Sequence, residues 1–189
     1  MDMRLFEKSP HVAPLLVRLY DSQRLNGLAK DDSPLARAEL TSAVVDLLKT
    51  DLGPRERELI SDVLISLMRQ AEQDLRQAIA ERLAVLDMVP LRVVLHIAND
   101  DIEIASPVLK LSAVLSDLDL LYIIKSKGPE YWRAIAARAH LSAGVMDVLA
   151  DTHEAGTLEA LAANDKITLS PHALDIAAQE AEISESLAR

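Results

Sequence analysis

The chain has 189 residues, half of them hydrophobic, which is enough for one domain with a sizeable core, although only three Tyr, one Trp and one Phe are aromatic. A net charge of −10 repels phosphate backbones, and so few aromatic rings leave little to stack on bases, so we expect no nucleic-acid partner. The absence of cysteine excludes disulfides, thiolate metal sites and cysteine nucleophiles, and the short, charge-broken apolar stretches predict no membrane span; both fit a cytoplasmic location.

Residues 1–50 are predicted to form N-terminal helices. The first spans 12–30, and a second starts at the signal Ser33-Pro34. Serine can cap the free N–H groups of a helix, and proline fits its first turn. A further helix with an apolar stripe follows over 54–70.

From residue 54 onward the sequence predicts a repeated two-helix unit. The segments that resemble one another are 75–86, 102–114, 131–140 and 156–164. Partner segments between them carry an apolar residue at intervals of 27, 27 and 28 residues, at Val94, Leu121, Val148 and Ile176. Such a period is typical of a solenoid, in which no single unit buries its own apolar face. We therefore predict an all-α fold, a solenoid of two-helix repeats, as a single domain over 1–189 with the repeats in 54–189.

Two runs rich in β-branched residues, 93–97 and 120–124, are ambiguous between strand and helix. We predict helices, because both runs occupy the same slot of the repeat as 143–150, which has no strand character. Pro107 falls inside a predicted helix and is expected in its first turn, with a kink as the alternative. Ile79 and Ile135 are predicted to be buried at equivalent positions of the repeat, and their burial tests its register.

Leu-Arg at residues 75–76 and Asn-Asp-Asp at 99–101 resemble the start of the second helix and the acidic turn of HEAT-type repeats, over about 55–115. Gln70 and Ala105 stand where the pattern usually has an acidic residue and a second arginine. The resemblance implies that the fold is a right-handed α-solenoid of HEAT-like two-helix repeats, with an incomplete Asp–Arg ladder between neighbouring repeats.

A second resemblance covers roughly residues 30–180. Its motifs are Ile-Ala-Asn-Asp-Asp at 97–101, Ala-Ser-Pro-Val-Leu at 105–109, Ala-Ile-Ala-Ala-Arg at 134–138, Leu-Ser at 141–142, and Asn164. In this order and spacing they are similar to the alphaproteobacterial domain-of-unknown-function family numbered twenty-three thirty-six. The family is uncharacterised, so the resemblance implies no activity. Its members are usually longer than 189 residues, and we expect this chain to be the N-terminal part of a longer protein.

The sequence holds no motif for catalysis, a cofactor or a metal. Five glycines cannot assemble a phosphate-binding loop or a dinucleotide fingerprint. Ser142 lacks the preceding glycine and strand of a nucleophile elbow, and is predicted to be a helix cap. No two of the five histidines have the i, i+4 spacing that places two ligands on one helix face. We expect no enzyme activity, no cofactor and no metal.

Basic residues are scarce in this acidic chain, and their spacing suggests a binding row. The candidate binding residues are Arg76, Arg82, Lys110, Trp132, Arg133 and Arg138. Arg82 and Arg138 lie 56 residues apart and are predicted to be equivalent across two repeats. An exposed Trp beside Arg is typical of binding hot spots. The alternatives are a tryptophan that anchors two repeats, and exposed ion pairs worth about 0–1 kcal/mol each.

These features favour a protein-interaction scaffold or adaptor. Solenoids present long continuous surfaces. The expected partner is a protein, with a basic segment as the candidate for the acidic stretch 151–189, which carries eight acids and two bases. The alternative is a ligand sensor or enzyme with a pocket between repeats. A third reading is a homo-oligomer formed through the apolar residues of the C-terminal helix.

Overall fold

The structure, a computed structural model, describes residues 41–46, 48–49 and 53–187, with side chains up to 180. In this part of the chain the regular secondary structure is helical, with no strand. The predicted all-α class is therefore confirmed for these residues. The helix predicted over 12–30 lies outside them.

The helices follow one another along the chain. Their bounds are α4 (Pro54–Gln70), α5 (Gln73–Leu83), α6 (Leu91–Ala98), α7 (Ile102–Leu111), α8 (Asp117–Ser126), α9 (Pro129–Ala136), α10 (Ala143–Ala150), α11 (Ala155–Ala162) and α12 (Pro171–Leu187). The runs 93–97 and 120–124 lie within α6 and α8, so the prediction that both are helical is confirmed. The residues spaced about 27 apart, Val94, Leu121, Val148 and Ile176, fall on α6, α8, α10 and α12.

Local sequence determines where several helices begin. Pro54 stands in the first turn of α4, where its missing N–H costs no hydrogen bond. At the start of α8, the Asp119 carboxylate accepts a hydrogen bond from Ser116 N at 2.9 Å, and Ser116 Oγ accepts one from Asp119 N at 3.4 Å. Ser142 Oγ accepts from Val145 N at 3.3 Å, which confirms the predicted cap at the start of α10.

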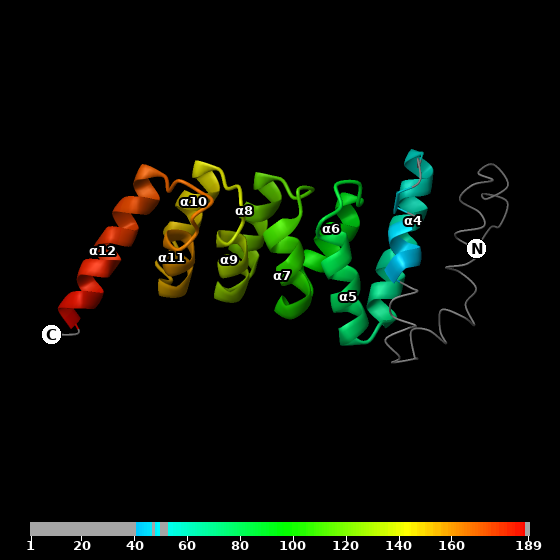
Figure 1. Cartoon of the computed structure of the whole chain (residues 1–189), viewed down its shortest axis with the longest axis horizontal. Helices are drawn as coiled ribbons and strands as arrows, with labels where there is room; N and C mark the ends of the chain where they lie inside the picture. Colours follow the sequence, from blue (N-terminus) through cyan, green and yellow to red (C-terminus); the bar gives the residue numbers. More distant parts are fainter. Residues whose placement is uncertain (1–40, 47, 50–52, 188–189) are drawn as a thin grey trace.

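Figure 1 shows the helices in two rows. In one row α5 packs on α7, α7 on α9, and α9 on α11; in the other, α8 and α12 pack on α10, and α4 packs on α6. The connections that follow the helices of the first row lie along one edge of the molecule, at the top of Figure 1. We call it the loop edge; its connections are 84–90, 112–116, 137–142 and 163–170.

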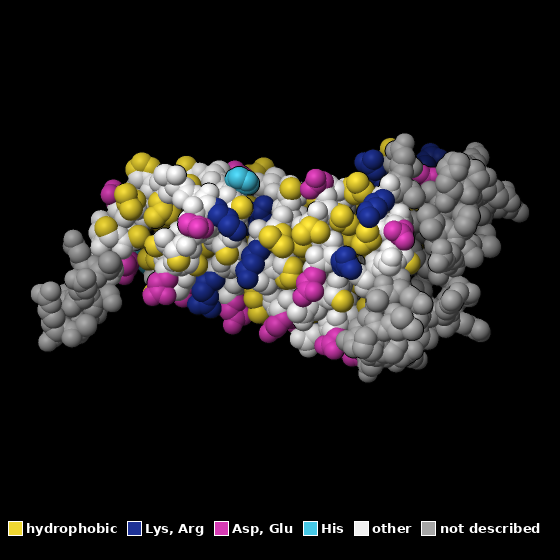
Figure 2. Space-filling model, viewed as in Figure 1, with side chains coloured by type: hydrophobic (Ala, Val, Ile, Leu, Met, Phe, Trp, Pro, Cys, Tyr) yellow, Lys and Arg dark blue, Asp and Glu magenta, His cyan; other side chains and the backbone are white. Residues whose placement is uncertain are grey.

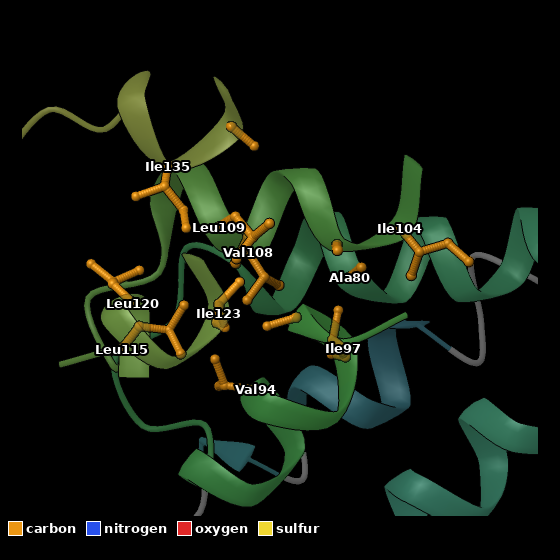
Figure 3. Close-up of a cluster of buried hydrophobic side chains, with 14 of the residues drawn as sticks. Ala80, Val94, Ile97, Ile104, Val108, Leu109, Leu115, Leu120, Ile123 and Ile135 are labelled. Atoms are coloured by element: carbon orange, nitrogen blue, oxygen red, sulfur yellow. The ribbon is translucent and has the colours of Figure 1, made fainter. Parts of the chain in front are cut away.

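The core between the rows is aliphatic. Ile97, Ile104 and Ile123 have no exposed surface, and they come from α6, α7 and α8 (Figure 3). Ile79 is 1% exposed and Ile135 is 0% exposed, so the predicted burial of both is confirmed. Helices that meet through Leu, Ile, Val and Ala can pack closely, which suits a chain with so few aromatic residues.

Pro107 lies in the second turn of α7, so its expected place in the first turn is wrong. Proline has no N–H, and Glu103, four residues before it, loses the usual helical partner of its carbonyl. The helix nevertheless continues to Leu111. Val108 and Leu109, directly after the proline, are 1% and 0% exposed, and their burial offsets the missing hydrogen bond.

Candidate functional site

Two of the predicted binding residues, Arg76 and Arg133, tie successive helix pairs together. Arg76 on α5 donates from Nη1 to Asp100 Oδ1 in the turn before α7, and its Nη2 lies 3.6 Å from an Asp101 carboxylate oxygen. Arg133 on α9 donates from Nη1 to Glu154 Oε1 at 3.2 Å, directly before α11. The two arginines therefore occupy corresponding places, each joined to the acidic turn before the next helix of its row.

Gly156 leaves the space that the Arg133 side chain fills. A Cβ at this position would lie 2.9 Å from Arg133 Nη1 and 3.2 Å from Glu154 Oε1. Glu154 is held further by Thr157, whose hydroxyl donates to Oε2 at 2.6 Å, and this hydrogen bond lowers the pKa of the Glu154 carboxyl. The carboxylate thus serves as a helix cap and as the partner of an arginine.

Arg138 is buried, which corrects its predicted place in an exposed row. It is 9% exposed, and its Nη1 and Nη2 donate to the carbonyls of Leu109 at 2.6 Å and Ser112 at 2.8 Å, at the end of α7. Burial lowers the pKa of the Arg138 guanidinium from its ordinary value, and Asp117 opposes that shift. The side chain works as a cap for the α7 carbonyls.

The remaining three candidates differ from one another. Trp132 is partly buried and donates from Nε1 to the carbonyl of Ile124 on α8 at 2.8 Å. This contact fits the alternative prediction, in which the tryptophan is an anchor and not an exposed binding residue. Arg82 and Lys110 are exposed in the last turns of α5 and α7, with no ion pair among the described residues. The structure therefore does not bring the six residues together into one surface.

Exposed apolar side chains cluster around α8, and we did not single them out from the sequence. Leu118 is 78% exposed and Tyr122 is 66% exposed, and with Lys125 they follow the i, i+4, i+7 spacing of one helix face. We call these three residues the α8 face. Leu111, just across the α7–α8 connection, is 59% exposed. On the side of the molecule drawn in Figure 2, hydrophobic side chains lie at the surface in groups, with lysines and arginines between them.

A hollow of about 590 Å³ opens at the loop edge. It is lined by residues of three successive connections and the start of α8, namely Ala113, Asp117, Arg138, Ala139, His140, Leu141, Ser142, Lys166, Ile167 and Thr168. We call it the loop-edge pocket. Three of its side chains are basic or can become so, and one is acidic.

A second hollow, of about 660 Å³, lies between α4 and α6. Arg92 lines it and pairs with Asp62 at 2.7 Å and with Glu58 at 3.1 Å. His96 also lines it, and burial lowers the pKa of its imidazole. The paired charges indicate that this hollow is a seam between two packed helices.

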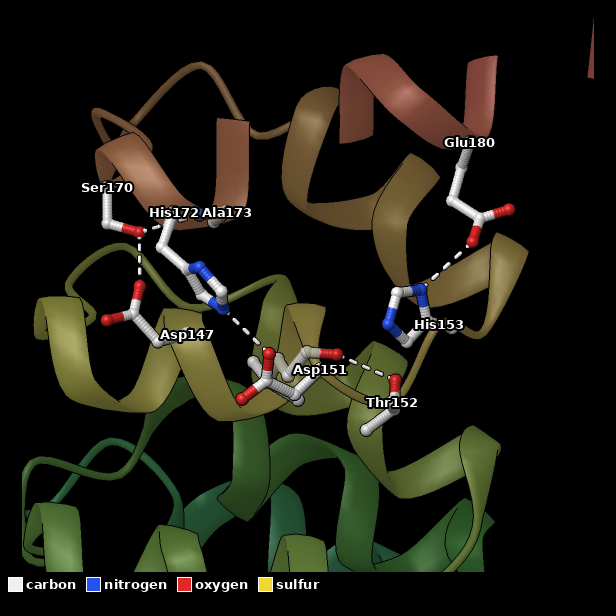
Figure 4. Close-up of polar contacts among 9 residues, drawn as sticks. Asp147, Asp151, Thr152, His153, Ser170, His172, Ala173 and Glu180 are labelled. Carbon is white, nitrogen blue, oxygen red and sulfur yellow. Dashed lines mark hydrogen bonds and ion pairs between the residues drawn. The ribbon is translucent and has the colours of Figure 1, made fainter. Parts of the chain in front are cut away.

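Two histidines hold α12 against the helices before it (Figure 4). His172 on α12 lies 2.7 Å through Nε2 from Asp151 Oδ1, and His153 lies 2.9 Å through Nδ1 from Glu180 Oε1. Ser170 Oγ donates to Asp147 on α10. Acidic residues of the C-terminal stretch are therefore partly engaged within the chain.

Replacing Asp151 with asparagine is expected to lower the pKa of His172. The hydrogen bond to Asp151 is the main cause that raises the pKa of His172 above the ordinary 6.5. Because the folded pKa is the raised one, the contact stabilises α12 fully below pH 6.5, and this contribution is lost as the pH rises through the folded pKa. An NMR titration of the His172 ring protons measures the change, and an unaltered titration in Asp151→Asn would contradict the assigned contact.

In the described part of the chain, no three His, Asp or Glu side chains come together in a way that could hold a metal ion. Within the same residues, no helix is both long and apolar enough to cross a bilayer.

Residues 104–189 match the sequence model of a family described as an uncharacterised protein conserved in bacteria (DUF2336). The predicted family resemblance is therefore confirmed, over this span. No curated protein and no solved structure matches the chain. The matched span contains the α8 face and every residue of the loop-edge pocket.

Proposed function

We propose that this protein, whose residues 104–189 match the uncharacterised bacterial family DUF2336, is a cytoplasmic protein-interaction scaffold with a binding rather than a catalytic role. In the proposal the chain is a single domain over 1–189, built in 54–189 as a right-handed α-solenoid of HEAT-like repeats. A solenoid of this kind offers a long surface to a protein partner.

The HEAT-like character is supported by the ties between successive helix pairs. Arg76 reaches the acidic turn at 100–101, and Arg133 reaches Glu154 at the corresponding turn two repeats later. They correspond to two rungs of the arginine ladder, one to aspartates and one to a glutamate. Between them, Lys127 Nζ donates to the carbonyl of Asn99 at 2.9 Å, so a lysine makes the intermediate connection.

The observation that carries the scaffold proposal is the exposure of the α8 face. Leu118 and Tyr122 each expose about two thirds or more of their surface, at 78% and 66%, side by side on one helix. Grouped exposed apolar side chains are typical of protein-binding surfaces, and tyrosine is enriched among the residues that dominate binding energy. Lys125 on the same face has no ion pair among the described residues, so it is free to contact a partner.

The structure weakens the case for a basic protein segment that binds the acidic stretch 151–189. Asp151, Glu154 and Glu180 already contact His172, Arg133 and His153 within the chain. The proposal therefore places the protein contact on the α8 face.

Replacing Leu118 with aspartate is expected to abolish partner binding without loss of fold. A charge at the centre of an apolar contact leaves a desolvated carboxylate in the complex, so we expect the yield of a specific partner to fall at least about tenfold, which corresponds to about 1.4 kcal/mol. The full chain is used as bait in a lysate of bacteria that contain a DUF2336 protein. Quantitative mass spectrometry of the captured proteins measures the yield.

The matched control is Leu174→Asp on α12, which makes the same change at a leucine that is 55% exposed. Proteins that are lost with Leu118→Asp and retained with Leu174→Asp are partners of the α8 face. Equal capture by both variants would contradict the proposed surface. Capture of the chain itself, together with a doubled mass in light scattering, would identify a homo-oligomer in place of a scaffold.

A further inference from the structure

We propose that the loop-edge pocket binds a small oxyanion, the group shared by phosphates and carboxylates. Arg138, His140 and Lys166 line the hollow of about 590 Å³, together with Ser142 at the start of α10. Asp117 is the one acidic side chain on its wall. This site goes beyond the scaffold role and does not depend on it.

The walls of the pocket are held in place by two side chains. Arg138 joins the connection 137–142 to the end of α7 through the carbonyls of Leu109 and Ser112. Asn164 joins the next connection to it, because its Nδ2 donates to the carbonyls of Ala136 at 2.9 Å and Arg138 at 2.7 Å. Three successive connections are thereby fixed around one hollow, and a site fixed before binding loses little entropy when a ligand enters.

The N-terminus of α10 adds backbone donors on the same side. The first N–H groups of a helix have no partner inside it, and together they carry a partial positive charge. Ser142 caps Val145 N at 3.3 Å, and no hydrogen bond engages the N–H groups of Ala143 and Gly144 in the described structure. A Cβ at Gly144 would meet nothing within 4 Å, so the space beside this turn is open.

Arg138 supplies the second, independent indication of a ligand. Its side chain lines the pocket and is 9% exposed, and its Nη atoms donate to two neutral carbonyls. Among the described residues this buried guanidinium forms no ion pair, so an anion in the hollow would supply the counter-charge that it lacks. In a chain with a net charge of −10, this concentration of basic side chains favours an anion at this place.

Titration of the ¹⁵N-labelled full chain with inorganic phosphate and, separately, with acetate tests the proposal. The probe signal is the backbone amide of Gly144, one of five glycines, and sodium chloride at equal ionic strength is the reference. We expect a saturable shift with at least one of the two oxyanions, and which of them binds identifies the source of the group. Lys166→Gln and His140→Gln should each weaken binding about fivefold, the loss of one charge-assisted contact.

Lys125→Gln is the matched control, since it removes an exposed lysine from the α8 face and should leave the midpoint unchanged. A shift that does not saturate, that chloride reproduces, or that Lys125→Gln and Lys166→Gln weaken equally would overturn the proposal. The Leu118→Asp variant should bind the oxyanion normally, so failure of the scaffold role and failure of this site give different results.

Discussion

Replacing Ile79 with aspartate is expected to unfold the protein or to lower its free energy of unfolding by several kcal/mol, because a buried unpaired charge is among the most destabilising changes known. Ile79 lies on α5 and is 1% exposed within the core that α5 shares with α7. Ile135, 0% exposed on α9, should behave in the same way. Thermal unfolding followed by circular dichroism measures both variants.

Two controls define this result. Leu118→Asp makes the same kind of change at a residue that is 78% exposed, and we expect it to alter the stability by no more than about 0.5 kcal/mol. Ile79→Val keeps the side chain apolar and removes one methyl group, for which about 0.5–1.5 kcal/mol is usual. If Ile79→Asp melts at the temperature of the unchanged protein, the packing of α5 against α7 is wrong.

The core and the order of the helices could be predicted because they depend on apolar periodicity. In the proposed solenoid each unit buries an apolar stripe against its neighbour. Val94 and Ile176 are buried in the core, and Leu121 and Val148 pack against it partly buried, so the spacing of about 27 residues marks core-facing positions. The β-branched runs in α6 and α8 would mislead a reading based on local propensity alone. The repeat resolves them, because packing in context overrides a weak local preference.

The exposed α8 face was missed for a related reason. Leu118 and Tyr122 belong to a run of apolar residues, and composition does not distinguish the buried members, Leu120, Ile123 and Ile124, from the exposed ones. The i, i+4 relation of Leu118 and Tyr122, directly after the Ser116 cap, was the available signal. It identifies a face but does not say which face meets the core.

The basic residues could not be placed because sequence shows their charge and not their partners. Arg76 and Arg133 both contact the acidic turn before the next helix of their row. Arg82 and Arg138 were predicted to be equivalent, yet Arg82 lies in the last turn of α5, while Arg138 lies beyond the end of α9. The helix α5 has 11 residues and α9 has 8, so Arg82 is still helical and faces solvent, whereas Arg138 follows the helix end and reaches the carbonyls of α7.

Replacing Arg138 with alanine is therefore expected to destabilise the protein by about 3 kcal/mol, since hydrogen bonds to charged groups contribute about 1.5–3 kcal/mol and the buried carbonyls of Leu109 and Ser112 would lose theirs. Asn164→Ala should cost less, about 1–3 kcal/mol, because it removes two neutral hydrogen bonds. Denaturant unfolding measures each loss, and the double variant should lose less than the sum, because Asn164 binds the backbone of Arg138 itself.

Arg82→Ala is the control that separates a buried cap from an exposed arginine. It removes the same side chain from the position that the spacing predicts to be equivalent, and we expect a change within about 0.5 kcal/mol. Because alanine removes charge and packing alike, Arg138→Lys adds a second comparison: lysine keeps the charge but cannot reach two carbonyls with one planar group, so it should restore only part of the stability. Equal, small losses for Arg82→Ala and Arg138→Ala would instead mean that Arg138 is a surface residue, and the predicted row of arginines would again be the better description of this edge.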